Sequence, residues 1–162
     1  MVRSVALKQV NILVWALVIL LMLSILGIGL INARAATISV RVRADVIWVD
    51  TGIVVTAGES VAIKATGLAI TGPLNQYPEA KSGPEGQAVN DSCGTYLPAG
   101  PCTLDGALYG ALIGRVGLSG TPFYIGDASS FTPSTSGALY LAVNDNLAFY
   151  DDNSAGYTVL FK

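Results

Sequence analysis

Two patterns of hydrophobic and polar residues divide the chain near residue 35. Residues 12–31 form a run of 20 residues without a charged side chain, interrupted only by Ser24, Gly27 and Gly29. At about 1.5 Å of rise per residue, a helix of this length spans about 30 Å, which is the thickness of a bilayer's hydrocarbon core. After Asn32 the apolar positions alternate with polar ones, as is typical of half-buried strands. The pattern predicts an N-terminal transmembrane helix within residues 1–35 and an extracytoplasmic β domain over residues 36–162.

The residues around the apolar run predict its orientation. Arg3 and Lys8 precede it, so the positive-inside tendency predicts a cytoplasmic N-terminus and a periplasmic C-terminal domain at a bacterial inner membrane. A cleaved signal peptide is the alternative, because residues 33–35 (Ala-Arg-Ala) have the small-x-small form of a processing site. Signal-peptide cores run about 7 to 15 residues, which is shorter than this run, so we favour an uncleaved anchor.

The alternating part predicts a series of short strands. Residues 38–43 alternate between apolar and polar side chains, and residues 53–56 and 61–65 are predicted to pair as a hairpin around a turn at residues 57–59. Further strands are predicted at residues 108–116, 123–126, 138–143 and 157–161. Short strands separated by turns that contain glycine and proline predict an all-β sandwich.

A long loop is predicted between these strands, because residues 72–102 hold five of the seven prolines. Loops of this length in a compact domain are usually functional or held by a covalent link. Cys93 and Cys102 are the only cysteines and both lie in this loop, and an extracytoplasmic location favours a disulfide between them. A zinc site would need C-x-x-C spacing or further Cys or His ligands, which the sequence lacks.

Composition and charge exclude several classes of function. The chain has no histidine, which removes the Ser-His-Asp triad, the Cys-His pair and His-ligated zinc or haem. After Ala35 six basic side chains stand against eleven acidic ones, and an acidic domain of formal charge −5 is not expected to bind nucleic acid. No pattern places two of the carboxylates across a cleft, as a glycosidase requires. We therefore expect no enzyme.

Residues 137–157 combine a predicted strand with a turn rich in oxygen ligands. Asp145, Asp151, Asp152 and Asn153 lie in this turn. Calcium takes about 6 to 8 oxygen ligands from carboxylates, amides and backbone carbonyls, so the turn is a candidate calcium site. Its spacing does not match an EF-hand loop. A solvated acidic turn that closes a hairpin is the alternative.

Six segments of the strand-rich region carry a family resemblance. They are WVDTGIVVTAGESVAIKATG at residues 48–67, TGP at 71–73, GPEG at 83–86, GALIGRVG at 110–117, IGD at 125–127 and SGALYLAVNDNLAFYDDNSAGYTV at 136–159. In order and approximate spacing they resemble the PA-IL-like galactophilic lectin family. The resemblance covers the chain from about residue 48 to the C-terminus. It implies a small jelly-roll-like β-sandwich with a calcium ion that bridges the protein and sugar hydroxyls.

The resemblance also implies which residues form the site. The calcium ligands would be the side chains of Asp145, Asp152 and Asn153 and the backbone carbonyls of Phe149 and Thr71. A bound galactoside would lie against Asp145, Asn146 and Asp152.

Two positions depart from the family pattern. Asp152 stands where the family has Asn, and a carboxylate there should tighten calcium binding while removing an amide donor. The family's sugar-contacting His and Gln come from the loop after GPxG. In that loop this chain has Val89, Asn90, Asp91, Ser92 and Cys93.

Two functions fit these features. The first is a non-catalytic accessory subunit of a bacterial membrane complex, of respiratory or photosynthetic type, with a periplasmic calcium-binding lectin-like domain. The second is a membrane-tethered, calcium-dependent galactoside-binding lectin. The apolar run and the missing sugar contacts favour the first. The expected partners are other membrane-protein subunits, the lipid bilayer and galactoside glycans.

Overall fold

The computed structural model describes Trp15 and residues 37–78, 80–87, 93 and 101–162. The chain divides into two units, Met1–Ala35 and Ala36–Lys162. Within the described residues, no helix is both long enough and apolar enough to cross a membrane. Apart from Trp15, the predicted transmembrane run lies outside those residues, so the membrane anchor stays a prediction from the sequence.

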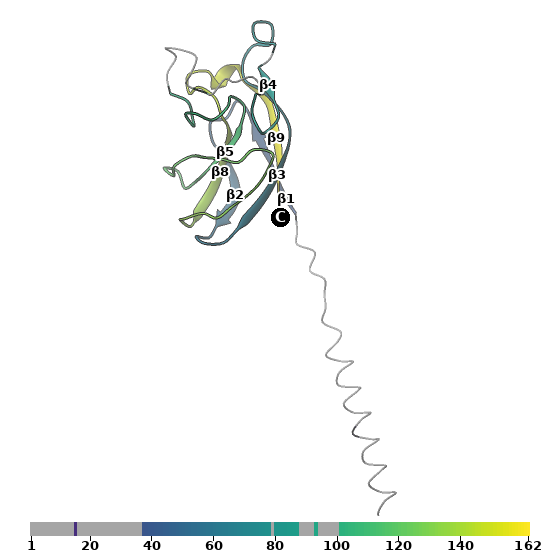
Figure 1. Cartoon of the computed structure of the whole chain (residues 1–162), viewed down its shortest axis with the longest axis vertical. Coiled ribbons are helices and arrows are strands. Elements are labelled where there is room, and N and C mark those ends of the chain that lie inside the picture. Colours follow the sequence, from purple (N-terminus) through teal and green to yellow (C-terminus); the bar gives the residue numbers. More distant parts are fainter. Residues whose placement is uncertain (1–14, 16–36, 79, 88–92, 94–100) are drawn as a thin grey trace, which may run out of the picture. The chain divides into compact units, whose positions relative to one another are not determined.

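The described part of the second unit, here called the β domain, is a β-sandwich of two antiparallel sheets (Figure 1). Its strands are β1 (Ile38–Arg43), β2 (Val49–Val55), β3 (Val61–Ile70), β4 (Lys81–Ser82), β5 (Leu112–Val116), β6 (Phe123–Tyr124), β7 (Ala128–Phe131), β8 (Gly137–Val143) and β9 (Ser154–Phe161). One sheet has the order β1-β9-β3-β4, with β7 also paired to β3, and the other has the order β2-β8-β5-β6. The all-β sandwich predicted from the alternating pattern is confirmed.

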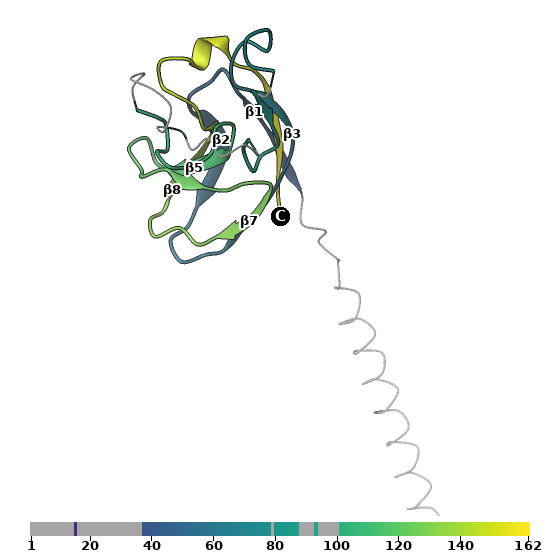
Figure 2. The same cartoon turned by 45° about the horizontal axis from the view of Figure 1, so that its top comes forward.

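The core lies between the two sheets, because neighbouring residues of a strand point to opposite faces. In β8, Leu139 and Leu141 are fully buried, whereas Tyr140 between them is only half-buried and faces outward. Figure 2 shows β1 and β3 on one side of this core and β2, β5 and β8 on the other. Burying one such aliphatic side chain contributes about 1.5 to 3 kcal/mol to folding. The core residues are Val42, Ala44, Val55, Ile63, Ala65, Ala69, Leu112, Ile125, Leu139, Leu141, Val143, Tyr157, Val159 and Phe161.

The predicted hairpin between residues 53–56 and 61–65 is wrong. β2 pairs with β8, whereas β3 pairs with β9, so the two segments lie in different sheets. The turn between them binds the loop before β8: Gly58 N–H donates to the Pro133 carbonyl at 2.9 Å, and Ala57 N–H donates to Ser136 Oγ at 2.9 Å. The turn therefore crosses from one sheet to the other and does not close a hairpin.

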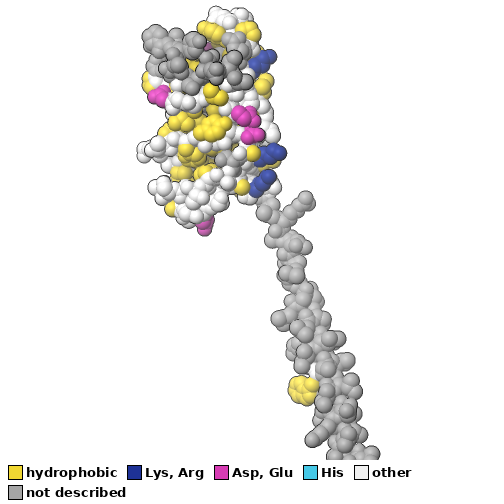
Figure 3. Space-filling view, in the orientation of Figure 1, with side chains coloured by type: hydrophobic (Ala, Val, Ile, Leu, Met, Phe, Trp, Pro, Cys, Tyr) yellow, Lys and Arg dark blue, Asp and Glu magenta, His cyan; other side chains and the backbone are white. Residues whose placement is uncertain are grey.

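Basic side chains are unevenly divided between the sheets. Arg41, Arg43, Lys64 and Lys81 belong to strands of the five-stranded sheet, whereas Arg115 is the basic residue of the four-stranded sheet. In Figure 3 the visible Lys and Arg side chains lie along one edge of the domain, and hydrophobic side chains occupy the middle of the face in view.

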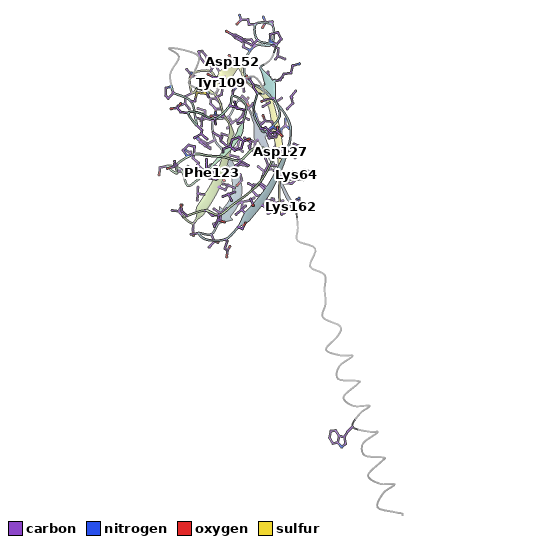
Figure 4. The ribbon with its side chains drawn as sticks, in the orientation of Figure 1. Lys64, Tyr109, Phe123, Asp127, Asp152 and Lys162 are labelled. Atoms are coloured by element: carbon purple, nitrogen blue, oxygen red, sulfur yellow. A yellow bond between two sulfur atoms is a disulfide. The ribbon has the colours of Figure 1, made fainter. Side chains whose placement is uncertain are left out.

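The two ends of the sandwich differ in what they carry. β8 ends and β9 begins at the same end, where residues 144–153 connect them. β1 pairs antiparallel with β9, with Ile38 opposite Phe161, so β1 begins and β9 ends at the opposite end. Figure 4 labels Asp152 and Lys162 near these two ends. At about 3.3 Å per residue, the length of β9 separates them by about 25 Å.

Candidate functional site

Residues 144–153 form a compact turn between β8 and β9. The turn contains a 3-10 helix, η2 (Tyr150–Asp152). The Phe149 carbonyl accepts the Asp152 N–H at 3.2 Å, and the Tyr150 hydroxyl donates to the Val143 carbonyl at 2.5 Å. These bonds fasten the turn to the end of β8. Four of the predicted calcium ligands, Asp145, Phe149, Asp152 and Asn153, therefore lie in one short turn.

Asp145 and Asn153 place buried oxygen atoms in this turn, where their residues are 4% and 7% exposed. Asp145 Oδ1 accepts the Asn146 N–H at 2.7 Å, and Asn153 Nδ2 donates to the Ala44 carbonyl at 3.2 Å. The second oxygen of each side chain, Asp145 Oδ2 and Asn153 Oδ1, is buried without a hydrogen-bond partner. Buried polar atoms nearly always have such a partner. Two unpartnered oxygens in one turn are acceptors that a hard cation such as calcium prefers.

The electrostatics of the turn also favour a bound cation. Burial raises the pKa of the Asp145 carboxyl above its ordinary value, the Asn153 side chain and the Asn146 N–H offset part of that rise, and the negative charge of Asp152 adds to it. Burial also raises the pKa of Asp152, with a smaller contribution from the charge of Asp151. Negative charge that is partly desolvated and self-repelling is stabilised by a bound cation.

Thr71, the fifth predicted ligand, comes from a neighbouring strand. It directly follows β3, and Ile70 at the end of β3 pairs with Ser154 at the start of β9. The register therefore places Thr71 beside Asn153. The Thr71 N–H donates to the Ala80 carbonyl at 2.8 Å, and its Oγ1 accepts a hydrogen bond from Gln87 Nε2 at 3.0 Å.

All five predicted calcium ligands thus lie at one end of the sandwich. We call this set the Asp145 corner, and it consists of Thr71, Asp145, Phe149, Asp152 and Asn153. It contains two carboxylates and one amide, so calcium would need backbone carbonyls to complete its ligands. No group of three or more His, Cys, Asp or Glu side chains that could hold a metal ion occurs in the part of the chain that the structure describes.

The three predicted sugar contacts differ in exposure. Asp152 is exposed, whereas Asp145 and Asn146 are buried. Asn146 Oδ1 accepts the Ala148 N–H at 2.9 Å, and the Asn146 backbone forms a β-bridge with Cys102. Phe149 is 43% exposed, so the surface next to Asp152 is partly apolar.

Cys93 and Cys102 form the predicted disulfide, with their Cα atoms 5.9 Å apart. The residue after this disulfide contacts the corner directly. Thr103 N–H and Thr103 Oγ1 donate to the Asp145 carbonyl at 3.0 and 3.1 Å. The disulfide-linked segment therefore supports the backbone of the central predicted ligand.

Asn144 is a structural residue of the site that the sequence pattern did not reveal. It is fully buried, and its side chain bonds to the backbone of residues 104–108. Its Oδ1 accepts the Leu104 N–H at 2.8 Å, and its Nδ2 contacts the carbonyls of Leu104, Ala107 and Leu108 at 3.1 to 3.2 Å. A polar residue immediately after an apolar strand was the available signal, but it did not indicate which loop the side chain binds.

The described surface includes a hollow near the 104–108 loop and another near Phe123. One, of about 380 Å³, is lined by Glu85, Asp105, Tyr124 and residues of the 104–108 loop. The other, of about 510 Å³, is lined by Phe123, Phe131 and hydroxyl-bearing residues of two loops. Neither includes a residue of the Asp145 corner.

The comparisons with known proteins bear on the fold. No protein-family model and no curated protein sequence matches the chain. Among solved structures, the chain is similar to one described as "EclA N-terminal domain; PllA-like lectin", with a TM-score of 0.55 and 24% sequence identity. The match covers 76% of this chain and 92% of that chain. The β domain therefore has a lectin-like fold.

Proposed function

We propose that the β domain is a non-catalytic, calcium-dependent carbohydrate-binding module of the lectin type. The observation that carries the proposal is the pair of buried, unpartnered oxygens, Asp145 Oδ2 and Asn153 Oδ1, in one turn. The similarity to a lectin domain over 92% of that domain's length supports the same function.

The chain offers a calcium ion several oxygen donors. Asn153 Nδ2 is held by the Ala44 carbonyl, so Asn153 Oδ1 remains as a buried acceptor. Asp145 is fixed through its Oδ1 and leaves Oδ2 for the ion. Asp152 would add a second carboxylate, and Phe149 and Thr71 would add backbone carbonyls. A bound calcium ion would supply open coordination positions for sugar hydroxyls.

Exposed residues of the turn would contact the sugar directly. The exposed carboxylate of Asp152 can accept hydrogen bonds from sugar hydroxyls. Phe149 and Leu147 are each 43% exposed and offer apolar surface to the C–H face of a sugar ring. A galactoside is the ligand class that the family resemblance implies, and we propose it as the first ligand to test.

The accessory-subunit role remains a prediction from the apolar run at residues 12–31 and from the missing sugar contacts. It would require the anchor to be retained, and another subunit could cover the Asp145 corner or leave it empty. No contact or geometry of the described residues favours it over carbohydrate binding, so the lectin-type function is the one proposed here.

Isothermal titration of the full chain in detergent, first with calcium and then with galactosides, tests the proposal. We expect calcium binding, followed by galactoside binding that EDTA abolishes. Asp152→Asn should weaken calcium binding by about tenfold, because it removes one charge from the ligand set. Asp151→Asn is the matched control: it removes the same charge from the neighbouring exposed residue, which is not a predicted ligand, and should weaken calcium binding less than Asp152→Asn does.

Absence of calcium binding would remove the metal site from the proposal. If calcium binds and the corner stays accessible, but added galactosides release no heat, the galactoside part of the proposal would be overturned. Equal effects of the two substitutions would mean that net charge of the turn, and not coordination by Asp152, governs calcium affinity.

A further inference from the structure

Arg115 has an unusual environment for a charged side chain. Its guanidinium carbon lies 4.3 Å from the ring centroid of Trp48 and 5.4 Å from that of Tyr140. Its Nε is buried and has no hydrogen-bond partner. The ion pair found within the described residues joins Arg43 and Asp45, so it leaves Arg115 unneutralised. A guanidinium carries five N–H donors, and leaving a buried donor unsatisfied is unfavourable.

The strand register places Arg115 on the outer face of the four-stranded sheet. Arg115 on β5 pairs with Tyr140 on β8, and Tyr140 also pairs with Asp50 on β2. Leu139 and Leu141, on either side of Tyr140, point into the core, so this row of three residues faces outward. At about 3.3 Å per residue along β8, the row lies about 16 Å from Asp145.

Asp50 does not neutralise Arg115, although both lie in the same row. Asp50 Oδ1 accepts the Gly52 N–H at 2.9 Å, which turns the carboxylate toward its own strand. Two strand spacings of about 4.8 Å also separate the two backbones. Burial lowers the pKa of Arg115, and the electrostatic effect of Tyr140 opposes this change. The site therefore holds a partly desolvated positive charge beside two aromatic rings.

We propose that Trp48, Arg115 and Tyr140 form a second carbohydrate subsite, independent of calcium, that binds the carboxylate of an acidic sugar such as a hexuronate. The planar guanidinium fork matches a carboxylate, with which it forms two parallel hydrogen bonds. The aromatic rings fix the guanidinium plane and offer apolar surface to the sugar ring. The choice of a sugar acid rests on the proposed lectin-type function, whereas recognition of a carboxylate does not.

The charge of the sheet favours a carboxylate over a phosphate. Among the described strands of this sheet, β2, β8, β5 and β6, Arg115 is the one residue that carries a positive charge. A single cation balances a singly charged carboxylate, whereas a phosphate monoester carries a charge of about −1.5 to −2 at neutral pH.

Nuclear magnetic resonance of the ¹⁵N-labelled full chain in detergent, with EDTA present, tests the proposal. We expect D-galacturonate to shift the Arg115 Nε–H and Trp48 indole N–H signals in a saturable way. D-galactose, which lacks the carboxylate, should leave both signals in place. Acetate, which lacks the sugar ring, should bind at least about tenfold more weakly.

Arg115→Lys keeps the charge but loses the planar fork, and we expect it to weaken galacturonate binding by about tenfold. Arg41→Lys is the matched control on the other sheet and should bind like the unmodified chain. No shift with galacturonate, or unchanged binding by Arg115→Lys, would overturn the subsite. Equal affinity for acetate would overturn the sugar part of the proposal. Because the titration is done in EDTA, its result does not depend on calcium binding at the Asp145 corner.

Discussion

Tyr157 joins three segments of the chain through one hydroxyl group. The residue is fully buried in β9. Its hydroxyl lies 2.5 Å from the Gly110 carbonyl and 2.9 Å from the Gly83 carbonyl. Burial raises the pKa of Tyr157, so the hydroxyl keeps the proton that these acceptors need. The loops before β5 and after β4 are thereby fixed against β9.

Tyr157→Phe should lower the free energy of unfolding by about 1 to 3 kcal/mol, because it leaves buried carbonyls without their donor. Urea denaturation of the full chain in detergent measures this change. Tyr124→Phe is the control: the Tyr124 hydroxyl bonds to one exposed carbonyl, that of Glu85 at 3.3 Å, and its loss should change stability by less than about 0.5 kcal/mol. Equal losses in the two variants would contradict a special role for Tyr157.

At the scale of single residues, candidate ligands can be predicted from the sequence more readily than the residues that hold the site's backbone and side chains in place. Asp145, Asp152 and Asn153 could be predicted because they stand close together in one acidic turn. Asn144 and Arg115 could not, because their partners come from distant parts of the sequence. Asn144 bonds to the 104–108 loop, and Arg115 packs on Trp48, the residue before β2. Only the folded chain brings these residues together.

At the scale of elements, the disulfide-linked segment is tied to the turn after β8. The Cys102–Asn146 bridge and the bonds from Thr103 to the Asp145 carbonyl connect the two. We expect the double substitution Cys93→Ser and Cys102→Ser to lower the free energy of unfolding by about 2 to 3 kcal/mol, because it frees a short closed loop in the unfolded chain. It should also weaken calcium binding.

Chemical denaturation and calcium titration of the same protein samples measure the two effects. Added reductant should lower both the stability and the calcium affinity of the unmodified chain. It should change neither quantity in the double variant, which has no disulfide to reduce. Unchanged calcium affinity in the variant would mean that the disulfide stabilises the fold without supporting the Asp145 corner.

Strands with alternating apolar residues could be predicted, whereas strand pairing could not. The pattern of β8 and the second half of β9 was sufficient to place them. β7 (Ala128–Phe131) lacks an apolar alternation and β4 (Lys81–Ser82) is only two residues long, so both were missed. The extension of β3 past Gly67 was also missed. A Cβ atom at Gly67 would lie 2.8 Å from the Gly156 carbonyl, so the glycine that suggests a strand end allows β3 and β9 to approach each other.

The hairpin error has the same origin. A turn with glycine between two β-rich segments predicts pairing between them, because local contacts are the only ones visible in the sequence. In the structure the turn bonds to residues 133–136, and the two segments enter opposite sheets. Sandwich topology is set by contacts between distant segments, which a single sequence does not display.

At the scale of the whole molecule, the Asp145 corner should link calcium to stability. A ligand present at 100 times its dissociation constant stabilises the folded state by about 2.7 kcal/mol. We expect calcium at this level to raise the thermal unfolding midpoint of the full chain in detergent, and EDTA to reverse the rise. Magnesium should have a smaller effect, because it keeps its water ligands more strongly than calcium does.

Asp145→Asn separates this linkage from the fold itself. Because burial raises the pKa of Asp145, the folded state holds its proton to a higher pH than the unfolded state does. The unfolding free energy of the calcium-free chain therefore falls as pH rises through that interval. Asp145→Asn removes the buried charge, so at neutral pH it should be more stable than the unmodified chain without calcium, by on the order of 1 kcal/mol, and should no longer respond to calcium. If Asp145→Asn is less stable in EDTA than the unmodified chain, the buried charge of Asp145 does not destabilise the calcium-free fold.

β1 begins, and β9 ends, at the end of the sandwich away from the Asp145 corner. A purification tag, fluorophore or sensor chip attached beyond Lys162 would therefore be joined about 25 Å from the corner, the length of β9 at about 3.3 Å per residue. Immobilised arrays prepared through this attachment point should keep the Asp145 corner free for glycan screening. Coupling through a cysteine introduced at Asp151 should block it.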